Sequence, residues 1–329
     1  MFEGKRIAVV VPAYNEEKLI LRVIETMPEF VDCIYVVDDC SKDATCQLVE
    51  EWQANQGDGQ RVKLVRQPHN QGVGAAIRDG YKAALEDGMD VMAVMAGDAQ
   101  MDPDELLKVV GPVAKNQTDY VKGNRLISNE AWQVIPKYRF FGNSILSLLT
   151  KIASGYWHVA DSQTGYTAIS AEALRIIPLD RLYPRYGYPN HILVMLNIFN
   201  FRVTDVTVRP VYNVGEQSGI RLKKVVPTIS WLLFRSFWLR MMQKYVVRDF
   251  HPLVFFYMLG LALLPPGIIL GFYLLLYRIF VNPVAITSAL FAVFLIVSGL
   301  QCLMFAMMFD MEANRDLKGD FGRGSGPLP

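Results

Sequence analysis

Two aspartates and an amide follow apolar stretches early in the chain, where they could bind a cation and a nucleotide. Asp98 comes after the apolar stretch 91–95, and Gln100 lies two residues further on. A carboxylate and an amide oxygen at this spacing can share one hard cation such as Mg²⁺, whose other ligands would be water and phosphate oxygens. Asp39 follows another apolar stretch and could accept hydrogen bonds from a nucleobase or a ribose. Either aspartate could instead only cap the turn or helix that follows it.

A glycine-rich segment, 70–80, lies at the start of a predicted helix. A dinucleotide-binding fingerprint needs such glycines directly after the first strand of a parallel sheet. Here the glycines follow the third predicted strand. The sequence therefore argues against an oxidoreductase of the Rossmann type.

Alternating apolar strands and helices predict the fold that would position these side chains. The predicted strands are 7–11, 31–37, 62–66, 91–95 and 120–123, and the helices are 16–27, 41–53 with Ser41 as its N-cap, 72–85 and 103–114. Residues 161–169 fit a strand or a loop. The alternation predicts an α/β fold, an open, mostly parallel sheet with helices on both faces. Such sheets bind ligands beyond the carboxyl ends of their strands, where we expect Tyr14, Asp39, Asp98 and Arg125.

Two uncharged apolar runs dominate the C-terminal part of the chain. Runs 252–277 and 284–309 are each about 26 residues long, which is enough for a helix to cross a ~30 Å hydrocarbon core. Basic residues flank the pair, whereas the link between the runs carries only Arg278. By the positive-inside rule we expect an integral membrane protein of the cytoplasmic membrane, with its catalytic domain and both termini in the cytoplasm.

These patterns divide the chain into four predicted parts. They are a cytoplasmic catalytic domain (1–220), amphipathic juxtamembrane helices (221–250), a transmembrane helical hairpin (251–310) and a cytoplasmic tail (311–329). Segment 225–247 mixes aromatic and basic residues, as expected of a helix at the membrane interface, although a helix packed on the soluble domain would show the same pattern.

Composition narrows the function classes further. The net charge of +1 argues against a nucleic-acid binder. The 4 cysteines show no CxxC spacing, so we expect reduced thiols. Residues 1–6 lead straight into a short strand, and we expect no signal peptide.

Five short motifs follow one another in order along the first part of the chain. They are Val-Pro-Ala-Tyr-Asn-Glu-Glu at 11–17, Val-Asp-Asp-Cys-Ser-Lys-Asp at 37–43, Asn-x-Gly-x-Gly at 70–74, Gly-Asp-Ala-Gln-Met-Asp-Pro at 97–103 and Gly-Asn-Arg at 123–125. Together they resemble the family 2 glycosyltransferases of GT-A fold. Within that family the chain is most similar to the polyprenyl-phosphate group, the dolichol-phosphate mannose synthases and bacterial undecaprenyl-phosphate glycosyltransferases. Several bacterial members have the same C-terminal two-helix anchor.

The resemblance implies a donor site and a metal site. The nucleotide sugar would be held by Pro12, Tyr14, Glu16, Asp39 and Asp98. The divalent cation, Mg²⁺ or Mn²⁺, would be held by Asp98 and Gln100. The family usually has a further aspartate where this chain has Ala96, so metal binding would rest on fewer carboxylates.

The resemblance also implies an acceptor site. The phosphate of the acceptor lipid would be bound by Arg125, Arg139, Asn143, Ser218, Arg221 and Lys223. Asp161 begins an Asp-Ser-Gln-Thr-Gly segment that matches the acceptor-side loop, and it would orient an arginine or a sugar hydroxyl. The late basic residues could instead form a solvated or lipid-headgroup face.

The chemistry of the acceptor favours arginines as the catalytic groups. A phosphate monoester has a second pKa of ~6, so at neutral pH it is mostly a dianion and needs little help from a general base. The protein must chiefly bring two anions together, which arginines do through bidentate contacts. We expect Arg125 and Arg139 in this role, with Asp98 and Asp161 completing the catalytic set.

The predicted reaction is the inverting transfer of a sugar from a nucleotide sugar to polyprenyl phosphate. A UDP-hexose or UDP-N-acetylhexosamine is preferred as the donor over GDP-mannose, and a homo-oligomer is expected. Gly267 and Gly271 are spaced for close helix contact, either within the hairpin or between subunits. One alternative is a processive polysaccharide synthase, but the chain has no Gln-x-x-Arg-Trp motif and no further spans. Another is an inactive membrane scaffold in which Ala96 marks a lost metal site.

Overall fold

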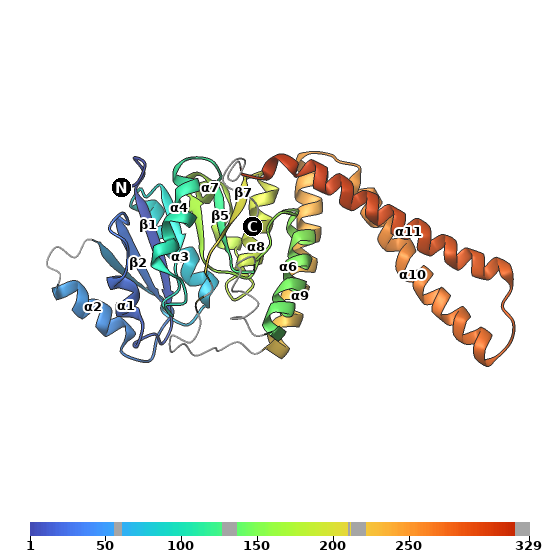
Figure 1. Ribbon diagram of the computed structural model, residues 1–329, viewed down its shortest axis with the longest axis horizontal. Coiled ribbons are helices and arrows are strands. Elements are labelled where there is room, and N and C mark those ends of the chain that lie inside the picture. Colours follow the sequence, from blue (N-terminus) through green and yellow to red (C-terminus); the bar gives the residue numbers. More distant parts are fainter. Residues whose placement is uncertain (56–60, 127–136, 210, 212–221, 320–329) are drawn as a thin grey trace. The chain divides into compact units, whose positions relative to one another are not determined.

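The structure is a computed structural model that describes residues 1–55, 61–126, 137–209, 211 and 222–319. The chain forms two compact units. The first consists of Met1–Phe237 together with the described residues from Asp316 onward, and the second of Trp238–Arg315. The first is an α/β unit and the second is helical (Figure 1).

One mixed sheet organises the first unit (Figure 1). Its described strands, in the order in which they lie side by side, are β3 (Val62–Arg66), β2 (Cys33–Asp38), β1 (Ile7–Ala13), β4 (Val91–Val94), β6 (Thr167–Ser170), β5 (Tyr120–Asn124) and β7 (Val203–Thr207). Neighbouring strands are parallel except that β6 runs antiparallel to both β4 and β5. The predicted mostly parallel sheet is confirmed, and β6 settles the open choice for 161–169 as a loop followed by a short strand.

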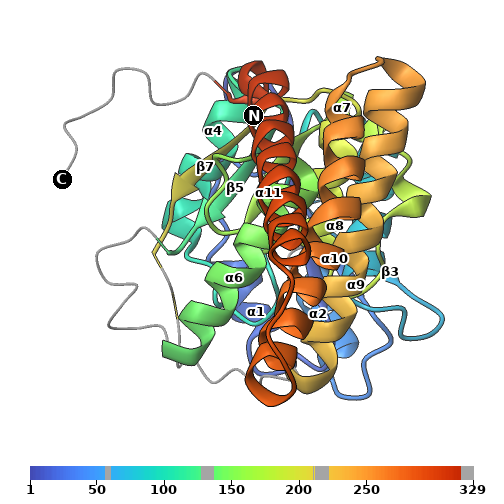
Figure 2. The same ribbon diagram turned by 90° about the vertical axis from the view of Figure 1, so that its right-hand side faces the viewer.

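Helices cover both faces of this sheet. The helices described in this unit are α1 (Ile20–Glu25), α2 (Thr45–Asn55), α3 (Val73–Glu86), α4 (Leu106–Ala114), α6 (Lys137–Ser154), α7 (Ala171–Ile176), α8 (Tyr188–Ile198) and the first part of α9 (Leu222–Met242), with 3-10 turns at η1 (Pro103–Glu105) and η2 (Leu179–Arg181). On one face, Val36 of the sheet packs in an apolar cluster with Ile20 of α1 and Val109 of α4. On the other face, Tyr188 of α8 donates a hydrogen bond to Tyr81 of α3 (3.0 Å). Helix α6 packs beside α8 (Figure 2).

The second helix begins later than the sequence predicts. Helix α2 begins at Thr45, so Ser41 is not its N-cap, and the backbone N–H of Thr45 donates to the Asp43 carboxylate (3.1 Å). The Ser41 hydroxyl instead accepts from the N–H of Asn15 (2.9 Å), a residue with φ of 57°. This contact ties the turn after β1 to the turn after β2, at the edge where ligands are expected.

The second unit contains a helical hairpin. Helices α10 (Leu253–Phe280) and α11 (Ile286–Ala313) run side by side and are long and apolar enough to cross a membrane, as predicted (Figure 1). A Cβ atom at Gly299 would lie 2.6 Å from the backbone nitrogen of Leu264, and one at Gly267 would lie 2.9 Å from that of Ile296. The two backbones therefore approach closely at glycines, as is common between membrane helices.

A buried polar cluster joins the flanks of this hairpin. It links the end of α9 and the π-helical segment η3 (Gln243–Arg248) to the last turn of α11. Arg240 donates to both carboxylate oxygens of Asp310 (2.7 and 2.9 Å), and both side chains are 0% exposed. The Tyr245 hydroxyl also donates to Asp310 (2.9 Å), and Lys244 donates to the amide oxygen of Asn314 (2.8 Å). Burial, with the charge of Arg240, lowers the pKa of Lys244 to about 7.

After the hairpin, the chain returns to the sheet of the first unit. The 3-10 turn η4 (Arg315–Leu317) leads to Lys318, which forms a parallel bridge with Val203 on the edge strand β7. The N–H of Gly319 donates to the carbonyl of Val203 (3.2 Å). A Cβ atom at Gly319 would lie 2.7 Å from the Cβ of Thr118, so this strand-like contact requires a glycine.

Candidate active site

The carboxyl ends of β1, β2 and β4 meet at one edge of the sheet. The N–H of Gly97, just after β4, donates to the carbonyl of Pro12 at the end of β1 (3.2 Å). A Cβ atom at Gly97 would lie 3.4 Å from the Cγ of Glu16, and the N–H of Asp39 donates to the carbonyl of Ala13 (2.9 Å). These contacts place the segments that carry Pro12, Glu16, Asp39 and Asp98 at a common edge, where the strand pattern predicts Asp39 and Asp98.

Asp39 organises the glycine-rich loop after β3. Its two carboxylate oxygens accept from the N–H groups of Gln71 (2.6 Å) and Gly72 (2.9 Å). Gly72 has φ of 102°, and a Cβ atom there would lie 2.7 Å from the carbonyl oxygen of Pro184, so only glycine fits. Burial raises the pKa of Asp39, although the two N–H donors oppose the shift. The glycines thus fit the loop closely around a carboxylate that retains further lone pairs for a ligand.

Asp98 lies in a tight turn directly after β4. It accepts from the N–H of Gln100 (3.1 Å), so it does cap its own turn, and Ala99 between them has φ of 53°. The pKa of the nearby Glu16 is raised to about 7, first by burial and then by the negative charge of Asp98. Two carboxyl groups therefore lie close together, and a bound cation would reduce the repulsion between their negative charges.

This donor set fits a divalent cation that is only partly coordinated by protein. Among the described residues, no group of three or more acidic, histidine or cysteine side chains lies close enough to form a closed metal site. Asp98 and Gln100 offer hard oxygen ligands, and Glu16 lies beside them with a carboxyl group that a bound cation would help to ionise. Mg²⁺ or Mn²⁺ held by so few protein groups takes its remaining ligands from water and phosphate oxygens.

Arg125 and Asp161, which are predicted to lie in the acceptor site, form an ion pair. The Nε of Arg125 donates to Oδ2 of Asp161 at 2.9 Å, and the backbone N–H of Arg125 approaches the same oxygen at 3.3 Å. Asp161 is 0% exposed, whereas the Arg125 side chain is 25% exposed. Burial opposes ionisation of Asp161, yet the charges of Arg125 and Lys122 leave its pKa below the ordinary value. Asp161 is therefore an ionised anchor that orients Arg125, which remains accessible to a ligand.

A buried polar layer joins the segment 161–165 to helices α6 and α8. The N–H of Ser162 donates to the hydroxyl of Ser147 on α6 (3.1 Å). On α8, the amide oxygen of Asn190 accepts from Thr150 of α6 (3.0 Å) and from the side chain of Gln163 (2.9 Å). Since α6 also carries positions 139 and 143, this layer fixes the helix of the predicted phosphate-binding residues against the Asp161 segment.

Several predicted site residues are placed only in part. Tyr14 lies after β1 and is 41% exposed. Arg139 and Asn143 lie on α6, and Lys223 lies on α9, but their side chains are outside the described residues, as are Ser218 and Arg221 altogether. Their assignment to the acceptor phosphate stays a prediction.

Two charged side chains near the site were not singled out from the sequence. Lys122 lies in the middle of β5 and is 0% exposed, and Asp205 pairs with it in register on β7. Asp205 accepts from the amide of Asn124 (2.7 Å) and from the N–H of Ala160 (3.1 Å). The sequence gives no signal for the burial of Lys122, because its strand also contains the polar Asn124 and lysine side chains are mostly exposed.

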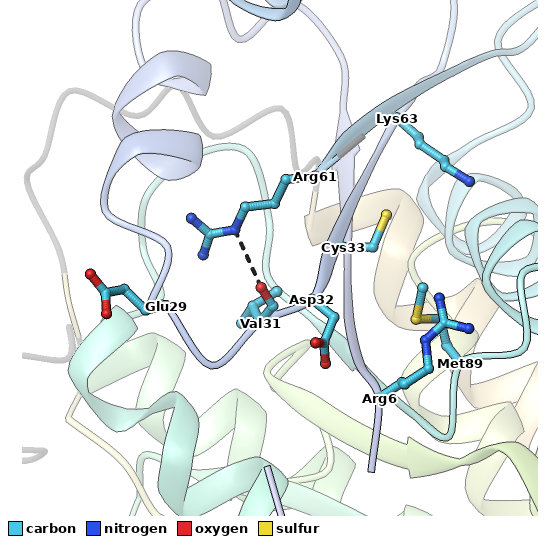
Figure 3. A pocket seen from close by; sticks show the side chains of 8 residues that line it. All are labelled: Arg6, Glu29, Val31, Asp32, Cys33, Arg61, Lys63 and Met89. Atoms are coloured by element: carbon cyan, nitrogen blue, oxygen red, sulfur yellow. Dashed lines mark hydrogen bonds between the residues drawn. The ribbon is translucent and has the colours of Figure 1, made fainter. Parts of the chain in front are cut away.

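A hollow of about 770 Å³ lies at the opposite ends of the strands (Figure 3). Its basic lining residues Arg6 and Arg61 come directly before β1 and β3. Arg61 donates to the carbonyls of Val31 (3.3 Å) and Pro28 (2.6 Å), and Lys63 pairs with Asp87 (2.6 Å). These basic side chains already form hydrogen bonds and an ion pair within the protein. Parallel sheets also bind ligands at the other ends of their strands. The hollow is not the candidate site.

Comparison with known families agrees with this arrangement. The profile described as "Glycosyl transferase family 2" matches residues 8–177, which include Asp39, Asp98, Arg125 and Asp161. The chain belongs to glycosyl transferase family 2. It is therefore a glycosyltransferase, and the family predicted from the motifs is confirmed.

Relatives of this glycosyltransferase act on polyprenyl phosphates, according to their names. It is 31% identical to a UDP-N-acetylglucosamine–dolichyl-phosphate N-acetylglucosaminyltransferase of Methanococcus voltae, over 63% of this chain and 86% of that protein. It is 28% identical to an undecaprenyl-phosphate mannosyltransferase of Micrococcus luteus, over 69% of this chain and 93% of that protein.

The fold of the glycosyltransferase is also similar to that of solved structures. One is glucosyl-3-phosphoglycerate synthase of Mycobacterium tuberculosis in complex with Mn²⁺, UDP and glucosyl-3-phosphoglycerate. It has a TM-score of 0.51 and 22% identity, and the match covers 72% of this chain and 80% of that one. At this identity the similarity shows the GT-A type of fold alone.

Proposed function

We propose that this glycosyltransferase moves a sugar from a nucleotide sugar to the phosphate of a polyprenyl phosphate, with inversion, at the cytoplasmic face of a membrane. The observation that carries the proposal is the Arg125–Asp161 pair: a buried, ionised carboxylate holds a partly exposed arginine (2.9 Å) at the edge that also carries Asp39 and Asp98. The chain has two helices of membrane-spanning length, and several of its relatives are named as polyprenyl-phosphate glycosyltransferases. A UDP-hexose or UDP-N-acetylhexosamine is the preferred donor.

The residues at this edge can perform the transfer without a dedicated general base. The acceptor phosphate is mostly a dianion at neutral pH, because its second pKa is ~6. Arg125 binds and orients this dianion, while Asp161, already paired and ionised, fixes the direction of the arginine. Asp39 and the loop around Gly72 hold the ribose and base of the donor.

A divalent cation held by Asp98 and Gln100 would neutralise negative charge on the departing diphosphate. Glu16 lies beside this position, and a bound cation would favour the ionised form of its carboxyl group, whose pKa is raised to about 7 without one. Arg139 on α6 is proposed as a second phosphate ligand. The proposed topology keeps the catalytic domain and both termini in the cytoplasm, and the expected homo-oligomer stays a prediction.

The proposal is tested with the purified full chain in lipid nanodiscs that contain polyprenyl phosphate. A panel of labelled donors (UDP-glucose, UDP-N-acetylglucosamine and GDP-mannose) is supplied, and label is measured in the lipid fraction. We expect one UDP-sugar to label the lipid only when polyprenyl phosphate is present, and Arg125→Ala to reduce transfer by about tenfold to a hundredfold with unchanged nucleotide binding. Label in a long polymer would indicate a processive synthase, and no transfer from any donor would favour a scaffold.

The proposed topology has a separate test. A cysteine is placed at Asn282, in the link between α10 and α11, in a chain whose own cysteines are replaced. We expect an impermeant thiol reagent to label it only from the side opposite the cytoplasm. Labelling from the cytoplasmic side would contradict a spanning hairpin.

A further inference from the structure

Lys122 is a buried charged group for which the mechanism above has no role. Its side chain is 0% exposed on the central part of β5. The Nζ atom donates to the carbonyl oxygen of Thr164 at 2.6 Å. Thr164 belongs to the segment that begins with Asp161, so one short hydrogen bond links the strand of Arg125 to the segment of its carboxylate partner.

The charges around Lys122 come from three directions. Arg125 acts on it from just beyond the end of β5, Asp161 from the neighbouring segment and Asp205 from β7, where it is the register partner of Lys122. The β6 residue in register with it, Thr167, carries no charge. The ionised form of Asp161 is thus stabilised by two positive charges, that of Arg125 in direct contact and that of Lys122 at longer range.

This arrangement gives the ammonium group two effects on the acceptor side. It holds the backbone of the 161–165 segment at Thr164, and it favours the ionised form of Asp161. Both effects act on Arg125 through its carboxylate, because Asp161 accepts from the arginine side chain and from its backbone N–H. A neutral side chain of the same length would fill the space but supply neither effect.

We propose that Lys122 is a positioning residue of the transfer reaction, whose positive charge fixes the Asp161–Gly165 segment and thereby the orientation of Arg125 toward the acceptor phosphate. This inference rests on the proposed function. It adds a residue that does not contact either substrate but controls the affinity for the acceptor through Asp161.

The protonation of Lys122 makes this role dependent on pH. Burial, opposed by the charges of Asp161 and Asp205, lowers the pKa of Lys122 to about 7. The ammonium form is therefore complete below that pH and is lost above it. The apparent affinity for the acceptor should weaken as the pH rises through about 7, although the acceptor phosphate itself becomes more ionised.

The test compares Lys122→Met, Lys122→Arg and Tyr120→Phe in full-length protein in nanodiscs. Tyr120 lies on the same strand, is equally buried and serves as the matched control for loss of a buried polar group. The measurements are the KM for polyprenyl phosphate and kcat between pH 6 and 9, calorimetric binding of UDP, and hydrogen exchange of residues 161–165.

We expect Lys122→Met to raise the acceptor KM by about tenfold or more, with UDP affinity within about twofold of the wild type. In the wild type the acceptor KM should rise above pH 7, and in Lys122→Met this dependence on pH should be absent. Lys122→Arg should restore a low KM and keep it low at pH 9, since its guanidinium stays charged. Tyr120→Phe should keep the wild-type pH profile. Faster exchange of 161–165 in Lys122→Met is expected independently of activity.

Three outcomes would overturn the inference. They are an unchanged acceptor KM and pH profile in Lys122→Met, an equal loss of UDP and acceptor affinity together with lower thermal stability, and a wild-type pH profile in Lys122→Arg. The last decides the matter if Lys122→Met does not fold. If the wild type transfers no sugar from any donor, the proposed function fails, while the exchange data still show whether Lys122 holds the segment.

Discussion

The buried pair of Arg240 and Asp310 yields the sharpest prediction about stability. Arg240→Ala removes both donors at 2.7 and 2.9 Å and leaves a carboxylate that is 0% exposed without its counter-charge. Breaking a buried ion pair in this way costs about 3–5 kcal/mol. Because Tyr245 (2.9 Å) and Asn314 (3.0 Å) still donate to Asp310, we expect the lower end, about 3 kcal/mol in the free energy of unfolding of the second unit.

The double variant Arg240→Met/Asp310→Leu distinguishes the loss of the ion pair from the cost of leaving one buried charge unpaired. It removes both charges at once, so no unpaired ion is left, and such replacements are often neutral within about 1–2 kcal/mol. The expected coupling between the two positions is therefore on the order of 2–3 kcal/mol. The exposed Arg278, at the other end of α10, is the matched control, and Arg278→Ala should change the free energy by less than about 0.5 kcal/mol.

The assay must report on the second unit alone. Cys302 on α11 is a free thiol of that unit, whereas Cys33, Cys40 and Cys46 belong to the first. Pulsed alkylation of Cys302, read by mass spectrometry across an SDS titration in mixed micelles, therefore follows unfolding of the hairpin. A loss below about 1 kcal/mol for Arg240→Ala, or a double variant as unstable as the single one, would refute the reasoning.

Three further predictions concern the first unit. Gly72→Ala forces a Cβ atom to 2.7 Å from the Pro184 oxygen at a φ of 102°, so we expect about 1–3 kcal/mol of destabilisation and weaker UDP binding by calorimetry. Asp98→Ala and EDTA should each abolish transfer and Gln100→Ala should weaken it, whereas full turnover in EDTA would contradict the metal assignment. His191 accepts from the N–H of Tyr183 (3.3 Å), and burial lowers its pKa from 6.5 to about 4. The free energy of unfolding should therefore fall by up to about 3 kcal/mol as the pH drops from 6.5 to 4, because only the unfolded chain binds that proton. In His191→Gln the thermal unfolding temperature should depend less on pH over this range.

The sequence predicts the strands of this fold well because buried parallel strands are short, continuous apolar runs. Strands β1 to β5 all lie within one or two residues of the predicted ranges. The predicted start of α2 at Ser41 was wrong because the Ser41 hydroxyl accepts from the N–H of Asn15, in the turn after β1, and the helix begins only at Thr45. Local propensity carries no information about such a contact.

In the candidate site, too, some features could be predicted from the sequence and others could not. Residues that follow strands, such as Asp39 and Asp98, could be placed from the pattern alone, since all parallel strands end at one edge. The partners of Asp39 in the glycine-rich loop and the short contact from Lys122 to Thr164 could not. Both depend on loops whose approach is fixed by the folded backbone, and Lys122 was hidden because lysine on a strand reads as a solvent-facing residue.

The return of the chain to β7 gives the membrane hairpin the topology of a domain insertion. The segments before and after Trp238–Arg315 belong to the same compact unit, so the hairpin interrupts the catalytic domain in sequence and does not follow it. Truncation before α10 would therefore also delete Lys318 and Gly319 and expose the edge of β7 to pairing with other chains. A soluble catalytic domain is better obtained by replacing 238–315 with a flexible linker. Such a linker keeps the returning segment on β7, whereas a simple C-terminal truncation would remove it.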